Sequence, residues 1–438
     1  MIRSLYTTYV TDYPEPGKHL FYNTRTQALI VIDDALKTAL ENLPEIPTDP
    51  AAAGAFQTLL EMDFLVNDKS EDVANIEHYF KELKSGPKSL DAIVLTTFSC
   101  NFACTYCVEE GVKEAVHMDE ETAEKTANYI VKQAKVQSAE TVHVSFYGGE
   151  PLLNVRALKT VARSIREAAK NLDISFAFSI TTNGVLLVPE LVDELVQLGF
   201  EGVKLTIDGD QENHDAKRPF KNGKGSYNLI MENLKYAAQK VDIDLGGNFD
   251  EENSASFPRM LDQLEELGLK SRIGRITFKP IAETPEDRSR TPANAELECV
   301  YSRPGTAETM STLRRELLNR GFATDPGIGV NICGITISGN HFTIDPQGKL
   351  YKCPALVGHE QFQVGDIKQG EVSQMGEKDL WRRCIDCENV PFCGDGCMYG
   401  AYIRYDDAMR LNCQREYVEC LIVENLKTLY ANTHRKTG

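Results

Sequence analysis

The sequence predicts an α/β fold built on a parallel sheet, and three observations lead to this prediction. Hydrophobic residues make up 42% of the chain and charged residues 26%, which is typical of a globular protein with a sizeable core. Between Asp91 and about Pro280, six short β-rich apolar runs alternate with helical segments. Several of these runs end in glycine-containing turns. Repeated βα units imply parallel strands with right-handed crossovers.

The six predicted strands are residues 92–96, 142–147, 174–181, 203–207, 241–248 and 273–279. Predicted helices between them are residues 120–136, 156–170, 189–198, 227–239 and 258–267. The pattern leaves open whether the sheet is flat or curls into a partial barrel. In either case, functional loops are expected at the carboxyl ends of the strands.

The first residues predict a separate small domain. Residues 19–32 read as two strands around an Asn-Thr-Arg-Thr turn, and Asp33-Asp34 can cap a helix that runs to Leu43. A second helix over 52–62 and a short strand over 64–66 complete this domain. The acidic, polar stretch 67–88 has a helical pattern in its middle, ends in Ser-Gly-Pro-Lys, and is interpreted as a linker.

The last third of the chain is irregular and rich in cysteine. Residues 281–332 look like a bridging segment with one helix near 310–320. Beyond Cys333, residues 341–345 and 349–353 suit a hairpin across Pro-Gln-Gly, and a helix over 413–429 closes the chain. The predicted divisions are therefore residues 1–88, 89–280, 281–332 and 333–438, consistent with a prior of roughly 150 residues per domain.

Charge and composition narrow the class of protein. The net charge of −18 and the absence of a long Lys/Arg run argue against nucleic acid or an anionic membrane as a partner. We find no run of 18 apolar residues and no secretion signal, so a cytoplasmic protein is expected. Twelve cysteines in 438 residues are too few for a disulfide scaffold, so the thiols are better interpreted as ligands or catalysts.

Three cysteines, Cys100, Cys104 and Cys107, follow the first predicted strand of the sheet. Their spacing lets three thiolates converge on one small inorganic cluster. A [4Fe-4S] cluster takes four ligands, so three thiolates leave one iron open to an exogenous ligand. The alternatives are a zinc site that lacks its fourth ligand and chance spacing.

This pattern resembles the radical S-adenosylmethionine (radical SAM) enzymes. The resemblance implies a partial (β/α)6 TIM-like barrel in which the open iron chelates SAM and an electron cleaves it to a 5′-deoxyadenosyl radical. It extends to Gly148-Gly149-Glu150-Pro151 after strand two, which is similar to the family's GGE motif for the methionine amino group. The implied catalytic residues are the three cysteines.

Further SAM contacts are implied by the same resemblance. Thr182-Asn183-Gly184 is similar to the TNG turn near SAM, and Tyr106 matches an aromatic position beside the adenine. Thr206, Asp208 and Arg218 resemble the SxDG…HDxxR pattern, in which the hydroxyl and guanidinium hold ribose and carboxylate oxygens. Ordinary turn chemistry is the alternative for Thr182, Asn183 and Asp208.

The C-terminal cysteines form a second dense array, for which a structural zinc site is the alternative. Their order resembles the SPASM extension of radical SAM enzymes, which carries two auxiliary [4Fe-4S] clusters. The resemblance assigns Cys333, Cys353 and Cys397 to the first cluster. It assigns a further four to the second: Cys384, Cys387, Cys393 and Cys413.

The first auxiliary cluster is then one ligand short. Cys299 and Cys420 are the remaining cysteines, and burial as structural thiols is the favoured interpretation of both. Our hypothesis is that the incomplete cluster has an open iron able to bind a substrate thiolate.

The N-terminal segment resembles the winged-helix-like peptide-recognition element of radical SAM maturases, which takes a leader peptide as an added strand. Tyr22, Leu29 and Ile30 could line that site, although they are more readily explained as core residues. The whole resemblance implies a maturase that modifies a ribosomally made precursor peptide, by thioether or related crosslinks, with an electron donor such as flavodoxin or ferredoxin.

Two alternatives stay open. An anaerobic sulfatase maturase would use the same clusters to make formylglycine, but those enzymes resemble one another in an Asp after the matched Cys353, where this chain has Pro354. A zinc-stabilised peptide-binding protein without catalysis would leave the GGEP, TNG and LTIDG segments without a role.

Overall fold

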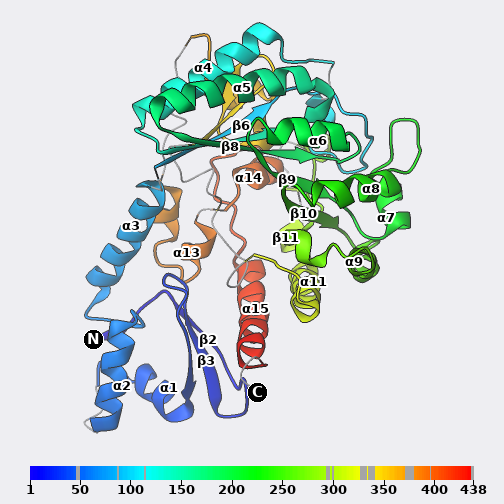
Figure 1. Cartoon of the computed structure of the whole chain (residues 1–438). Coiled ribbons are helices and arrows are strands. Elements are labelled where there is room, and N and C mark those ends of the chain that lie inside the picture. The colour runs from blue at the N-terminus through cyan, green and yellow to red at the C-terminus, as the bar shows by residue number, and fades with distance from the viewer. Residues whose placement is uncertain are drawn as a thin grey trace.

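A nine-stranded sheet forms the centre of the molecule in the computed structural model (Figure 1), which describes residues 1–45, 50–85, 88–112, 115–292, 296–297, 300–325, 333, 341–369, 379–394 and 396–435. The strand order is β11-β10-β9-β8-β7-β6, and the sheet continues beyond β6 with three strands from the last third of the chain. The six predicted strands are all present, each within three residues of its expected ends: β6 (Ser89–Leu95), β7 (Thr141–Tyr147), β8 (Ser175–Thr182), β9 (Phe200–Thr206), β10 (Asp242–Phe249) and β11 (Ile273–Pro280). They pair in parallel, in sequence order, which confirms the predicted α/β class.

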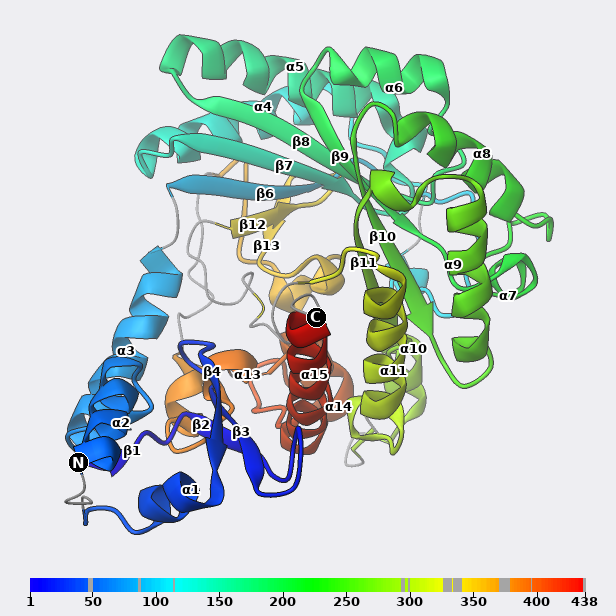
Figure 2. The same cartoon turned by 60° about the horizontal axis from the view of Figure 1, so that its bottom comes forward.

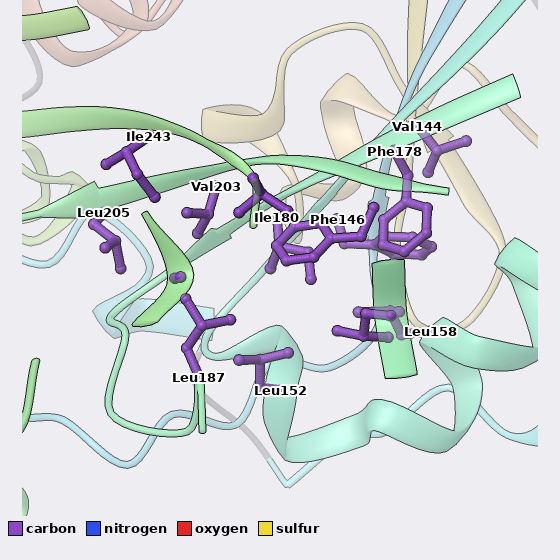
Figure 3. Close-up of a cluster of buried hydrophobic side chains, with 14 of the residues drawn as sticks. Val144, Phe146, Leu152, Leu158, Phe178, Ile180, Leu187, Val203, Leu205 and Ile243 are labelled. Carbon is purple, nitrogen blue, oxygen red and sulfur yellow. The ribbon is translucent and has the colours of Figure 1, made fainter. Parts of the chain in front are cut away.

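Helices cover one face of this sheet (Figures 1 and 2). The predicted helices are α4 (Glu120–Val136), α5 (Val155–Leu172), α6 (Pro189–Val196), α8 (Tyr227–Ala237) and α9 (Phe257–Glu266), and the prediction missed the short α7 (Gln211–Lys217). The helix-facing side chains of the strands form the main core (Figure 3), in which Phe146 and Phe178 are fully buried. Burying one such side chain contributes roughly 1.5–3 kcal/mol.

The opposite face of the sheet is polar. On β7, Val142, Val144 and Phe146 are buried, whereas the alternate residues His143, Ser145 and Tyr147 are partly exposed. This alternation follows from the two-residue period of a strand. The polar face therefore leads up to the carboxyl ends of the strands.

The N-terminal domain is a three-stranded antiparallel sheet with helices. Its strands β2 (Thr7–Val10), β3 (Lys18–Asn23) and β4 (Leu29–Asp33) precede α1 (Asp34–Glu41) and α2 (Pro50–Glu61). Asp33 caps α1 as expected, because its carboxylate accepts from the backbone N–H of Leu36. The sequence analysis missed β2, and also β1 (Ile2–Arg3), which pairs with β5 (Leu65–Val66).

The stretch interpreted as a linker is mostly helix. Residues Lys69–Ser85 form α3, in which Ile76 and Phe80 are buried against Trp381. A helix with a buried apolar face is a packed element rather than a flexible connection. The sequence interpretation missed this packing because Trp381 lies some 300 positions further along the chain.

The predicted C-terminal hairpin is present as β12 (His341–Ile344) and β13 (Lys349–Tyr351). It is not separate from the core, since β12 pairs in parallel with β6 and the sheet continues through β13 to β14 (Gly365–Asp366). The remaining helices are α10 (Pro285–Arg290), α11 (Thr306–Arg320), α13 (Val390–Cys393), α14 (Met398–Tyr405) and α15 (Arg415–Arg435).

The last helix, α15, packs against the N-terminal sheet. Its Leu421 and Leu426 are buried with Val10 and Leu20 of the N-terminal sheet. Both views place α15 beside this sheet (Figures 1 and 2). Within the described ranges, we find no helix with the length and apolar character needed to span a bilayer.

Candidate functional site

Cys100, Cys104 and Cys107 line a cavity of about 430 Å³ at the carboxyl ends of the central strands. Nearly all the residues predicted to contact SAM share this lining: Tyr106, Gly148, Gly149, Thr182, Asn183, Thr206 and Arg218. The structure therefore brings together segments that are spread over more than a hundred residues of sequence. Two predicted residues, Glu150 and Asp208, are fully buried behind the lining.

The turn after β7 holds the cysteine-bearing segment by backbone contact. A Cβ at Gly149 would lie 2.3 Å from the carbonyl oxygen of Ser99, and one at Gly148 would lie 2.5 Å from that of Thr97. Gly148 also has a positive φ of 108°, which disfavours any side chain. The backbone N–H of Glu150 donates to Ser99 at 2.8 Å. The glycines are thus required by the protein's own packing, whatever ligand they also approach.

The other side of the cysteine segment pairs with the chain after α7. Ala103 and Thr105 donate backbone hydrogen bonds to Pro219 and Lys217, at 2.9 and 3.0 Å. The rings of Phe102 and Phe220 meet edge to face, with centroids 5.0 Å apart. The cysteines are therefore fixed from both sides before any ligand binds.

Glu150 joins the ends of two strands. Its carboxylate accepts from the backbone N–H groups of Leu152 (2.9 Å) and Asn183 (2.8 Å) and from the Thr182 hydroxyl (2.8 Å). Asn183 in turn donates to the Asn101 side chain at 2.7 Å. Burial raises the pKa of Glu150, although these hydrogen bonds oppose the shift. The direct role of this carboxylate is to tie β7, β8 and the cysteine segment together.

A buried polar network forms one wall of the cavity. The Tyr106 hydroxyl donates to Asp208 and accepts from Arg218 Nη1 at 2.7 Å and Asn248 Nδ2 at 3.1 Å. Asp208 also accepts from the Asn248 backbone N–H at 2.7 Å, and burial raises its pKa while Arg218 opposes the rise. One buried atom, Arg218 Nε, has no hydrogen-bond partner among the described residues. A buried donor beside a cavity is suited to an anionic or carbonyl ligand.

His214 supports this wall from behind. Its Nδ1 accepts from the Asp208 backbone N–H at 3.2 Å, and its Nε2 lies 3.0 Å from the Ser226 hydroxyl. Burial, followed by the charge of Arg218, lowers the pKa of His214 to about 3. The imidazole is therefore neutral at physiological pH and orients the backbone at Asp208.

The donor set fits an iron–sulfur cluster. In the described part of the chain, no three or more His, Cys, Asp or Glu side chains converge so that they could hold a single metal ion. The thiolates of a [4Fe-4S] cluster each bind a different iron, so they surround a volume instead of meeting at one point. Three thiols around a cavity agree with that requirement better than with a mononuclear zinc site.

The C-terminal thiols lie in two groups. Burial and the negative charges of Cys397 and Cys333 raise the pKa of the Cys353 thiol to about 12, which places these three thiols near one another. Arg415 lies by two others, since it donates to Cys387 Sγ at 3.2 Å and interacts with the charge of Cys413.

The second group is held together by short local contacts. Cys384 and Cys387 share a turn closed by a 2.8 Å backbone hydrogen bond, and Cys393 ends α13. A Cβ at Gly396 would lie 2.5 Å from the Asn412 carbonyl oxygen, so the segment beyond Cys393 packs directly against the residue before Cys413.

Cys420 and Cys299 are the two cysteines that the resemblance assigns to no cluster. Cys420 lies on α15, packs against the cluster formed by the N-terminal sheet and α15, and interacts with Glu308 and Glu424. Within the described part of the chain, Cys420 has no contact with Cys353. Cys299 lies outside the described residues.

Residues 94–264 match the Radical SAM superfamily. This part of the chain is a radical SAM domain. Over 349 residues the chain is 26% identical to mycofactocin maturase MftC of Mycolicibacterium smegmatis, covering 71% of this chain and 79% of the relative. It is 23% identical to a cysteine-type anaerobic sulfatase-maturating enzyme of Clostridium novyi, covering 71% and 88%.

Two solved structures share the fold. AdoMet-bound anSMEcpe superposes with a TM-score of 0.57 at 17% identity, covering 79% of this chain and 99% of its own. Streptococcus suis SuiB bound to its precursor peptide SuiA gives a TM-score of 0.50 at 14% identity, covering 91% of this chain and 95% of its own. The second match extends over more of this chain than the first.

The cavity residues that the sequence analysis missed include two polar residues and two tyrosines. Asn248 and Lys279 end predicted strands, so the rule that sites form at the carboxyl ends of parallel strands could have found them. Tyr147 also ends a predicted strand, whereas no such signal marks Tyr399. Burial raises the pKa of Tyr147, and so do the charges of Glu109, Cys107 and Cys353. Tyr147 is thus near a thiol of the radical SAM domain, Cys107, and near one of the C-terminal region, Cys353.

Proposed function

We propose that this radical SAM enzyme modifies a ribosomally synthesised precursor peptide, with thioether or related crosslinks as the product. One observation carries the proposal. A single cavity is lined both by the three thiols of the radical SAM domain and by Ala355 and Tyr399, which lie close in sequence to Cys353 and Cys397. A peptide in this cavity would be within reach of the three cysteines of the radical SAM domain and of Cys353 and Cys397.

The proposed roles follow the geometry. Cys100, Cys104 and Cys107 would hold the [4Fe-4S] cluster, and the cavity that they line would take SAM. When bound, these cofactors would supply the radical chemistry that removes hydrogen from the peptide. Two auxiliary [4Fe-4S] clusters are proposed at the remaining assigned cysteines. An external one-electron donor such as flavodoxin or ferredoxin is needed.

The chain's own residues orient the reactants. Tyr106 and Asp208 hold the Arg218 guanidinium in place, which leaves its Nε to bind an oxygen of SAM. Tyr147 and Tyr399 wall the cavity and exclude water from the reacting carbon. Gly148, Gly149, Thr182, Asn183 and Thr206 are proposed as further SAM contacts, with Glu150 acting through the strand ends that it ties together.

The N-terminal domain is proposed as a winged-helix-like peptide-recognition element. β4 is an edge strand, because β3 is its one strand partner in the described chain. An edge strand offers backbone donors and acceptors to an extended peptide. The relative MftC is named as a maturase, and SuiB was solved with a precursor peptide, which supports the same kind of partner here.

The second candidate is an anaerobic sulfatase maturase. The match to the Clostridium novyi enzyme and the fold of anSMEcpe favour it. Pro354 after Cys353 argues against it, because proline cannot supply the carboxylate expected there. The anSMEcpe structure also leaves about a fifth of this chain unmatched.

Iron content after anaerobic reconstitution tests the proposal. The wild type should hold about twelve irons per chain, and the Cys100→Ala/Cys104→Ala/Cys107→Ala variant about eight, because it loses one of three [4Fe-4S] clusters. The variant should also lose reductive cleavage of SAM to 5′-deoxyadenosine. A variant with no iron and retained zinc would show that the C-terminal thiols are structural, and would exclude the crosslinking mechanism.

The bond type is tested by mass. If a short Cys-rich open reading frame lies beside the gene, its peptide is co-expressed with the chain and weighed. A crosslink removes about two hydrogens per bond formed, whereas an epimerisation leaves the mass unchanged. Formylglycine in place of Cys or Ser would favour the sulfatase-maturase alternative.

A further inference from the structure

The N-terminal domain contacts the cysteine-rich region at residues 384–393, which we call the cysteine loop. This segment carries Cys384, Cys387 and Cys393, three of the four thiols proposed to hold the second auxiliary cluster. The contact joins residues that are more than 300 positions apart in the sequence. Both views place α3 and the N-terminal sheet beside α13, the last part of this loop (Figures 1 and 2).

Three hydroxyl groups of the N-terminal domain donate hydrogen bonds to backbone carbonyls of the cysteine loop. Tyr6 donates to Ile385 at 2.8 Å, and Thr24 donates to Glu388 at 2.6 Å. Tyr79, from α3, donates to Pro391 at 3.0 Å. The acceptors are three residues apart, so the hydroxyls fix the loop along its whole length between the first and the last of its cysteines.

Apolar and ionic contacts surround these hydrogen bonds. Phe80 stacks on Trp381 with ring centroids 4.3 Å apart, and Tyr22 stacks on Phe392 at 6.1 Å. Trp381 is the one tryptophan of the chain and is only 6% exposed. Along α3, Lys69 pairs with Asp386 at 2.9 Å, and two further ion pairs join Glu77 to Arg382 and Lys84 to Asp379.

The loop has little regular structure of its own. Its internal backbone bonds are those of short turns, such as Cys387 to Cys384 at 2.8 Å, and of the four-residue helix α13. Short segments of this kind open locally at low cost unless other elements hold them. Cluster ligands must keep a fixed geometry, because each thiolate binds its own iron.

We infer that Tyr6, Thr24 and Tyr79 hold the cysteine loop in the shape that its thiols need to keep an iron–sulfur cluster. The N-terminal domain is then part of the second auxiliary cluster site as well as a peptide-recognition element. This inference rests on the proposed function for the identity of the cluster, but not for the fixed shape of the loop.

The test is the full-length variant Tyr6→Phe/Thr24→Val/Tyr79→Phe, which removes the three hydrogen bonds while nearly keeping side-chain volume. After anaerobic reconstitution, about four irons should be released to a ferrous chelator roughly 10- to 100-fold faster than in the wild type, because three typical hydrogen bonds no longer oppose loop opening. The irons held by Cys100, Cys104 and Cys107 should keep their wild-type release rate. Reductive SAM cleavage, which depends on these irons, monitors their retention.

Tyr13→Phe is the matched control. Tyr13 makes the same kind of bond across the same domain contact, from its hydroxyl to the Lys427 carbonyl at 3.0 Å, but it touches α15 instead of the cysteine loop. This variant should release iron at the wild-type rate. Equal acceleration in Tyr13→Phe would mean general loosening between the domains and would overturn the inference, as would an unchanged rate in the triple variant.

Two readouts do not depend on a cluster. In the triple variant, Trp381 emission should shift to the red as the indole is exposed, and the loop thiols of the apoprotein should be alkylated faster. If the wild type holds only about four irons, the proposed auxiliary clusters are wrong, and these readouts alone decide whether the hydroxyls fix the loop. Unchanged emission and alkylation would then refute the inference.

Discussion

At Gly149, the absence of a side chain lets the turn after β7 lie directly against the segment that carries Cys100. A methyl group there would meet the carbonyl oxygens of Phe98 and Ser99 at 2.5 and 2.3 Å. Backbone atoms cannot give way as a flexible side chain can. The position of the three thiols therefore depends on one missing Cβ.

We expect Gly149→Ala to lose the irons of the radical SAM domain, about four per chain, and with them SAM cleavage. The C-terminal irons should stay. Iron analysis and 5′-deoxyadenosine formation measure the two effects. Gly111→Ala is the control, because a Cβ there meets nothing within 4 Å. Wild-type iron in Gly149→Ala would show that the turn tolerates a methyl group.

His214 predicts a pH dependence of stability. Its pKa falls from 6.5 to about 3 in the folded protein. Between pH 6.5 and pH 3, the imidazole is therefore protonated in the unfolded chain but not in the folded chain. Stability must therefore decrease as the pH falls below 6.5. Between pH 7.5 and 5.5, the wild type should lose about 1.4 kcal/mol more than His214→Gln, which carries no titrating group at this position. Denaturant unfolding at both pH values measures the difference, and equal losses would contradict the expected neutral imidazole.

Among the elements, β4 has a defined open edge. The bonds from Asn23 to Ala28 and from Asp34 to Gly17 bracket the β3–β4 hairpin and fix which pairs exchange hydrogen bonds. Residues alternate between bonded and non-bonded pairs in an antiparallel ladder. Leu20 and Val31 form a non-bonded pair, so the N–H and C=O of Val31 face away from β3. Val31 is also 41% exposed.

Val31→Pro removes one outward donor without breaking the β3–β4 ladder. If a peptide adds to this edge, the variant should modify the co-expressed peptide at least about tenfold more slowly, the effect of losing one backbone hydrogen bond of roughly 1.4 kcal/mol. Val31→Ala controls for the side chain. Iron content and SAM cleavage should match the wild type in both. Unimpaired peptide modification in Val31→Pro would place the peptide elsewhere.

Over the whole molecule, the N- and C-terminal parts form one packed body around the sheet. Ile76 and Phe80 of α3 are buried against Trp381, and Lys84 is ion-paired with Asp379. Trypsin should therefore cut at Lys81 or Lys84 more slowly than in the exposed turn at Lys221–Lys224. Time-resolved digestion with mass analysis measures the order of cleavage. Early release of an N-terminal fragment cut within α3 would support the original linker interpretation.

The sequence by itself determined the features that local chemistry controls. The two-residue and helical periods of the hydrophobic residues predicted the six parallel strands and their helices, because these periods depend only on neighbouring residues. The spacing of Cys100, Cys104 and Cys107 and the cap at Asp33 are equally local. These signals need no knowledge of distant parts of the chain.

Only the tertiary structure decided what depends on contacts between distant segments. It joined β12 to β6, buried the Glu150 carboxylate between two strand ends, and packed the supposed linker against Trp381. It also set the hydroxyls of Tyr6, Thr24 and Tyr79 on the cysteine loop. The sequence near these residues does not predict their partners. In the unfolded chain a hydroxyl or carboxylate forms its hydrogen bonds with water, and only the fold brings a specific acceptor or donor to it.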